Sequence, residues 1–79
     1  MGTVDSQPDL VLLTVRQRQV LEAIKAFIEA KRYPPSIGDL AGACGIARST
    51  VAYHLNGLEA AGRIERDPWV DRGIRVVEP

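Results

Sequence analysis

The chain has few of the features that give small proteins covalent stability or reactive chemistry. It contains one cysteine, Cys44, in 79 residues, so no intrachain disulfide can form. This cysteine usage is typical of a reducing, intracellular compartment, and no metal site is predicted because no further ligand stands at suitable spacing. Without disulfides or a metal, the packing of regular elements must stabilise a single small domain.

Long hydrophobic runs are also missing. No apolar stretch approaches the roughly 20 residues that a membrane-spanning helix needs. The first residues do not combine a basic region with an apolar core, so no secretion signal is predicted. We therefore expect a cytoplasmic protein without a membrane partner.

An excess of either charge is absent as well. Ten basic and ten acidic residues give a net charge of zero, whereas nucleic-acid-binding proteins usually carry a basic excess. The distribution matters more than the sum. From Arg48 to Arg75 the chain has five arginines and four acidic residues, so a basic face can form there. The balance keeps a protein-contact module open as an alternative.

The first predicted helix follows Thr14, an N-cap residue with Gln17 three positions later, as in a capping box. Apolar side chains then recur at helical spacing, and the sequence Pro34-Pro35 stops the helix just after Lys31 and Arg32. The apolar stripe comprises Val20, Leu21, Ile24, Phe27 and Ile28.

A second helix is predicted over residues 37–44, between the N-cap Ser36 and Gly45, for which we expect a positive φ. A third helix is predicted from Arg48 to about Ala61, and Gly62 ends it. A short helix, a tight turn with glycine and another helix form a helix-turn-helix. Its core side chains are expected to be Leu40, Cys44, Ile46, Val51, Leu55 and Leu58.

Two short alternations of apolar and polar residues follow, at residues 63–66 and 73–77, and they predict a β-hairpin. Trp69 lies between them, and we expect it to pack on the first helix; the alternative is that it projects from the tip of the hairpin as a contact. The predicted fold class is α+β, mainly α: a winged helix-turn-helix of three helices and a C-terminal hairpin. Residues 1–12 are expected to be a flexible arm, and residues 13–79 the domain.

The third helix, once its apolar side faces inward, presents a polar side outward. The first turn of such a helix usually reaches base edges in the DNA major groove. Arginine can bind guanine, hydroxyl groups can bind bases or phosphates, and asparagine can pair with adenine or contact a phosphate. Either Ser49 or Thr50 could cap the helix instead. The predicted contacts on this helix are Arg48, Ser49, Thr50, Tyr53 and Asn56.

The remaining predicted DNA contacts lie outside the third helix. Ser36 begins the second helix, whose N-terminus can meet a phosphate, and Arg66 and Arg72 lie on the hairpin, where cations commonly meet the DNA backbone. A charged strand edge that only faces solvent is the alternative. Each of these polar residues is otherwise an ordinary surface residue.

Catalytic chemistry is not predicted. His54 follows the apolar face of the third helix and is expected to be half-buried and hydrogen-bonded, and Cys44 is expected to be a small core residue. No nucleophile with a base, phosphate loop or carboxylate pair is recognisable. We expect no enzyme activity, no cofactor and no metal.

Several segments resemble the DNA-binding domain of LexA-type SOS repressors over about residues 13 to 77. They are residues 13–17, Leu21 and Ile24, residues 33–36, His54-Leu55, Leu58-Glu59, Gly62, Ile64, residues 66–68 and residues 72–74. The resemblance implies a winged helix-turn-helix that binds double-stranded DNA.

The sequence also departs from that family. The segment between Gly45 and His54 is one residue shorter, so base-reading roles are not transferred residue by residue. The self-cleaving peptidase domain of such repressors, through which they mainly dimerise, has no counterpart in these 79 residues. The Ala61-Gly62 pair matches the dipeptide they cleave, but here it ends a helix.

The sequence therefore predicts a sequence-specific double-stranded DNA-binding protein, a bacterial or phage transcriptional repressor associated with the nucleoid. A homodimer is expected from the symmetry of operators. The alternatives are a winged-helix protein-interaction module and a plasmid or phage replication or partition factor.

Overall fold

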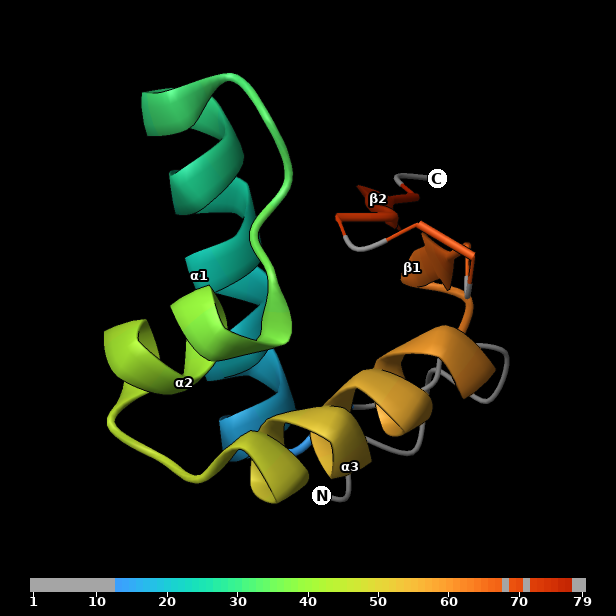
Figure 1. The fold of residues 1–79 in the computed structure, drawn as a ribbon. Coiled ribbons are helices and arrows are strands. Elements are labelled where there is room, and N and C mark those ends of the chain that lie inside the picture. Colours follow the sequence, from blue (N-terminus) through green and yellow to red (C-terminus); the bar gives the residue numbers. More distant parts are fainter. Residues whose placement is uncertain (1–12, 68, 71, 78–79) are drawn as a thin grey trace, which may run out of the picture.

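The computed structural model describes residues 13–67, 69–70 and 72–77. It contains three helices followed by a two-stranded antiparallel sheet: α1 (Val15–Lys31), α2 (Ile37–Cys44), α3 (Arg48–Ala60), β1 (Ile64–Arg66) and β2 (Ile74–Val76). Helices α2 and α3 pack against α1, and the hairpin follows the C-terminal end of α3 (Figure 1). The predicted winged helix-turn-helix is confirmed.

Local sequence signals explain the ends of α1. The Thr14 hydroxyl accepts from the Gln17 N–H at 3.1 Å, and the Gln17 side chain accepts from the Thr14 N–H at 3.0 Å. This capping box was predicted. The helix ends at Lys31, and Arg32 takes a left-handed conformation with φ 68° while its N–H donates to the Ile28 carbonyl. The two prolines beyond it prevent further helix.

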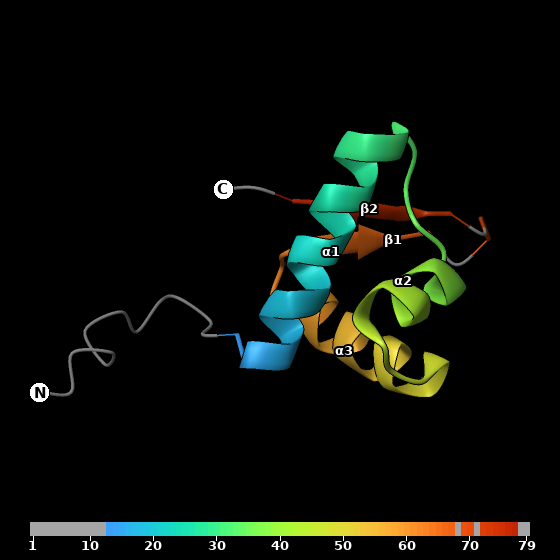
Figure 2. The same cartoon turned by 90° about the vertical axis from the view of Figure 1, so that its left-hand side faces the viewer.

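The turn between α2 and α3 depends on one glycine. Gly45 ends α2 with φ 68°, as expected, and its N–H and that of Ile46 both donate to the Ala41 carbonyl, at 2.9 and 3.1 Å. Such a doubly bonded end closes the helix and turns the chain sharply. As a result α2 and α3 both lie on the same side of α1 (Figure 2).

The core lies between the three helices and the hairpin. Burying each large apolar side chain contributes about 1.5–3 kcal/mol before the cost of ordering the chain. Phe27, Ile28, Cys44 and Ile46 are only partly buried, so the predicted core was slightly too wide. The fully buried members are Val20, Leu21, Ile24, Leu40, Val51, Leu55, Leu58, Ile64 and Ile74.

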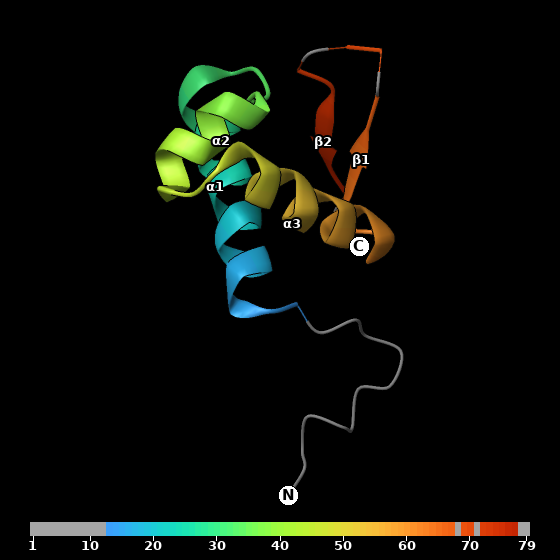
Figure 3. The same cartoon turned by 60° about the horizontal axis from the view of Figure 1, so that its bottom comes forward.

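The hairpin is joined to the helices by its alternating strands. Ile64 pairs with Val76 and Arg66 with Ile74, so that Ile64 and Ile74 are buried while Glu65 and Arg75 face outward and form an ion pair across the strands. In Figure 3 the hairpin rises beside the C-terminal end of α3, and β2 lies on the side nearer α2.

The loop of the hairpin needs glycine at position 73. The Asp67 N–H donates to the Gly73 carbonyl at 2.9 Å, and a Cβ atom on Gly73 would stand only 2.7 Å from the Asp67 carbonyl oxygen. Backbone atoms cannot move aside as a flexible side chain can, so this close approach requires glycine.

Two further expectations concern the chain ends and membranes. The flexible arm predicted for residues 1–12 lies outside the described residues. In the described part, none of the helices is long and apolar enough to cross a bilayer.

Candidate nucleic-acid interface

Helix α3 has two sharply different sides. Val51, Leu55 and Leu58 are 0% exposed and face the core, whereas Tyr53 on the opposite side is 71% exposed. Arg48 and Ser49 in the first turn are exposed too, as is Asn56, and Thr50 is half-buried. The described residues therefore present a continuous polar ridge along the outside of α3, as the sequence predicts.

The N-terminus of α3 has no side-chain cap. Its N-cap residue is Ala47, which forms no capping hydrogen bond. Neither Ser49 nor Thr50 occupies the capping position, so the alternative role considered for them is wrong. Their hydroxyl groups and the first-turn N–H groups are left for an outside acceptor, at the end of the helix where the dipole favours an anion.

Arg48 is an exposed cation at the start of this ridge. It forms no ion pair with the described residues, and its guanidinium lies over Gly38 in α2, where a Cβ atom would stand 2.8 Å from an Arg48 terminal nitrogen. Because Gly38 has no side chain, the guanidinium can cross the first turn of α2. The long exposed side chain can also rotate outward, since no carboxylate retains it.

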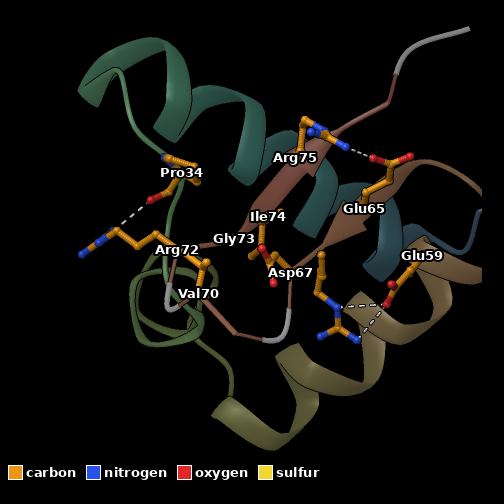
Figure 4. Close-up of a pocket in the computed structure, with 10 residues that line it drawn as sticks. Pro34, Glu59, Glu65, Asp67, Val70, Arg72, Gly73, Ile74 and Arg75 are labelled. Carbon is orange, nitrogen blue, oxygen red and sulfur yellow. Dashed lines mark hydrogen bonds and ion pairs between the residues drawn. The ribbon is translucent and has the colours of Figure 1, made fainter.

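Ser36 and Arg72, both predicted contacts, meet at the carboxylate of Asp39. The Ser36 N–H donates to Asp39 Oδ2 at 3.0 Å, and Arg72 donates to the same oxygen at 2.7 Å. Arg72 also donates to the Pro34 carbonyl at 2.9 Å (Figure 4). Its guanidinium carbon lies 4.9 Å from the centre of the Tyr33 ring. Arg72 therefore ties the hairpin loop to the N-terminus of α2.

This arrangement changes the acidity of Asp39. The hydrogen bond from the Ser36 backbone, and next the one from Arg72, hold the pKa of Asp39 below its ordinary value of 3.8. A lowered folded-state pKa means that the ionised carboxylate stabilises the fold above pH 3.8. That stability is lost as the pH falls through the folded-state value.

We therefore expect Asp39→Asn to unfold at lower urea concentration than the wild type at neutral pH, with the difference shrinking at pH values below 3.8. Asparagine can still accept from the Ser36 N–H, so the missing charge opposite Arg72 causes the effect. Urea denaturation followed by circular dichroism at both pH values measures it. An equal difference at both pH values would contradict the assigned role of the ionised carboxylate.

Asn56 and Arg66, also predicted contacts, meet on the flank of α3. Arg66 donates to the side-chain oxygen of Asn56, and its Nε donates to Glu59 at 3.1 Å. Arg75 is paired with Glu65. Of the hairpin arginines, Arg66, Arg72 and Arg75 thus already have carboxylate partners, so their charges are largely offset within the domain.

A groove separates the hairpin from α3 and the start of α2. It has a volume of about 540 Å³ and includes Ile37, Leu55, Val70 and Ile74 among its lining residues. A neighbouring pocket shares part of this lining and carries the paired charges of the hairpin (Figure 4). Charged residues line the groove as well: Arg66, which is already bound to Glu59, and Asp67. Two carboxylates beside one paired arginine give this groove little attraction for phosphate.

The prediction that Trp69 packs on the first helix is wrong. Its side chain is 92% exposed at the end of the hairpin, and its backbone N–H donates to the Asp67 carboxylate at 3.0 Å. The hydrogen-bonded turn holds the backbone so that the indole points into solvent.

The prediction for His54 was wrong in part. It is only 9% exposed, and its Nδ1 has no hydrogen-bond partner in the described part of the chain. Its position on the inner side of α3, three residues after Val51, explains the burial. Among the described residues no group of three potential metal ligands is found.

Comparison with known proteins agrees with this arrangement. A family model described as the LexA DNA binding domain matches residues 11–73. Similar proteins include the LexA repressors of Frankia alni, 41% identical over 76 residues and 95% of this chain, and of Geobacillus thermodenitrificans, 45% identical over 67 residues and 84% of this chain. The LexA repressor of Staphylococcus carnosus is 46% identical over 66 residues, or 82% of the chain. The chain spans 30–32% of the length of these relatives.

Proposed function

We propose that this chain, which belongs to the LexA DNA-binding domain family, binds double-stranded DNA sequence-specifically and acts as a transcriptional repressor. The observation that carries the proposal is the two-sided α3. The residues on its inner side are buried in the core, and its outer side presents hydrogen-bond donors from Arg48, Ser49 and Tyr53. A helix of this kind in a helix-turn-helix lies in the major groove.

Each residue of the ridge has a role that suits its chemistry. Arg48 can donate to guanine O6 and N7, and Ser49 and Thr50 can donate to a base or to a phosphate. Tyr53 can contact a thymine methyl group or donate to a phosphate. The uncapped first turn of α3 favours the approach of the phosphate backbone.

The hairpin arginines have a different role in this proposal. Arg66 ties the hairpin to α3 through Glu59, and Arg72 ties it to α2 through Asp39. Any contact of these two arginines with a DNA phosphate is secondary to this structural role. Ser36 contributes its hydroxyl group, because its backbone N–H is already bound to Asp39. Most of the contacts with bound DNA therefore come from α3.

Repression then requires only that the bound domain cover a promoter, and no catalytic step is part of the proposal. The protein would act in the cytoplasm, at the nucleoid. Two copies are proposed to bind a two-fold symmetric site, because symmetric operators match symmetric dimers. Selection of bound sequences from a random duplex pool tests this, and a consensus without two-fold symmetry would contradict the pairing of copies.

Arg48→Ala is expected to lower the affinity for the selected duplex by about 10-fold, as for the loss of one good guanine or phosphate contact. The slope of log affinity against log salt should fall by about one, because one counterion fewer is released. Fluorescence anisotropy at several salt concentrations measures both quantities.

Lys31→Ala is the matched control. It removes the same charge as Arg48→Ala, but from the C-terminal end of α1, away from the outer side of α3. Its affinity and salt slope should stay close to those of the wild type. If Arg48→Ala behaves like Lys31→Ala, Arg48 does not face the DNA. If the wild type retains no duplex at all, the proposed function itself fails.

A further inference from the structure

The contact between Arg66 and Asn56 fixes the direction of an amide on the proposed DNA-binding helix. Arg66 belongs to β1 and reaches back to α3, where it donates to Asn56 and, through Nε at 3.1 Å, to Glu59. A terminal nitrogen of Arg66 also lies 3.1 Å from the Glu59 carboxylate, and the Arg66 side chain is only 25% exposed. Asn56 itself is exposed.

The chemistry of the two side chains determines which Asn56 atom is used. A guanidinium group carries only donors, so the atom that faces it must be the amide oxygen of Asn56. The amide nitrogen, with its two N–H groups, then points away from Arg66. Glu59 strengthens this arrangement because it holds the guanidinium at a second point, one turn along α3 from Asn56.

An asparagine held in this way cannot turn its amide to meet adenine without losing its contact with Arg66. Adenine recognition needs the amide to donate to N7 and to accept from the N6 amino group at the same time. The bond from Arg66 takes one of the two lone pairs of the Asn56 oxygen and fixes the plane of the amide. Both N–H donors stay available on this exposed residue, which suits a group that only accepts.

We propose that Asn56, oriented by Arg66, donates to a backbone phosphate of the bound duplex and does not read a base. This inference rests on the proposed DNA binding. Asn56 lies eight residues after the start of α3, about 12 Å along its axis, whereas base contacts usually come from the first turn. Phosphate oxygens accept hydrogen bonds only, and the phosphates and sugars together receive half or more of all protein–DNA hydrogen bonds.

In this account Arg66 is a positioning residue that acts through Asn56. Its charge is offset by Glu59, so the pair contributes a directed hydrogen bond and little counterion release. The contact would set the register of α3 along the groove without adding sequence preference of its own.

The test uses the duplex selected from a random pool, with one phosphate at a time replaced by an uncharged methylphosphonate. At one position the substitution should weaken wild-type binding about 5-fold, as for one lost hydrogen bond. Asn56→Ala should bind the normal duplex about 5-fold more weakly and lose its sensitivity at that position. Its order of preference among single-base variants of the site should match the wild type.

The variant Asn56→Asp separates the loss of a DNA contact from a loss of folding stability. Aspartate keeps an oxygen for Arg66 but replaces the donors by a negative charge, so binding should fall by more than about 10-fold while the fold stays intact. Methylphosphonate at the contacted position should restore part of this loss. A structural role for Asn56 alone would give no such rescue.

Arg66→Met removes the orienting contact, and Arg75→Met removes the same charge from the same hairpin without touching Asn56. The methylphosphonate sensitivity should fall with Arg66→Met and persist with Arg75→Met. If Asn56→Ala instead changes the preference at one base pair and keeps the methylphosphonate pattern, Asn56 reads a base and the inference is wrong. Absence of any wild-type complex would contradict the proposed function, and not this inference alone.

Discussion

Ser49→Glu is expected to reduce the affinity for the selected duplex by more than about 100-fold while the domain stays folded. Ser49 is exposed in the uncapped first turn of α3, where an acidic side chain suits the positive end of the helix dipole. The fold should therefore be as stable as the wild type or slightly more so. Against DNA, the new carboxylate faces phosphates, and opposed like charges cost several kcal/mol.

Ala30→Glu provides the control for Ser49→Glu. It adds the same charge at an exposed position in the last turn of α1, far from α3 in Figure 1. Anisotropy titrations should show nearly wild-type binding for this variant. An equal loss of DNA affinity in the two variants would mean that the net charge of the protein, and not the outer side of α3, determines binding.

Leu55→Ala is expected to remove a large part of the stability of the domain. Leu55 is 0% exposed and lies in the core cluster shared by the helices and the hairpin. Truncating a buried leucine costs about 2–5 kcal/mol. A domain of this size has a total stability of only about 4–12 kcal/mol, at roughly 0.05–0.15 kcal/mol per residue.

Tyr53→Ala is the companion to this change, because Tyr53 lies two residues earlier on the same helix and is 71% exposed. Its free energy of unfolding should change by less than about 0.5 kcal/mol. Urea denaturation followed by circular dichroism compares the two variants. If Tyr53→Ala lost more unfolding free energy than Leu55→Ala, the side of α3 that carries Tyr53 would be the one in the core, and the described fold would be contradicted.

Local sequence signals were sufficient to predict the elements. The helix ends are set by chemistry within a few residues: Thr14 with Gln17, Ser36 with Asp39, and Gly45 with its left-handed backbone. The predicted range 37–44 for the second helix is confirmed for that reason. The outer ridge followed as well, because a helical period with a buried side determines the exposed side.

The side-chain networks could not be predicted in this way. Arg72 meets Asp39 across 33 positions in the sequence, and Arg66 meets Asn56 across ten. Composition shows how many charges there are, but only the fold determines which of them meet. For the same reason the sequence could not show which carboxylate each hairpin arginine meets.

Trp69 illustrates a second limit. Its apolar character suggested burial, but the hydrogen bond between its backbone and Asp67 controls the direction of a loop side chain. Hydrophobicity is a poor guide where the backbone is held by a tight turn and no apolar surface lies opposite.

The most direct test of the account is an amide chemical-shift titration of the isotope-labelled domain with the selected duplex. We expect the largest shifts at Arg48, Ser49 and Tyr53, with smaller ones at Asn56, and almost none in the last two turns of α1. Unchanged α3 amides alongside strong shifts on another surface would contradict the claim that α3 is the part of the molecule that binds DNA.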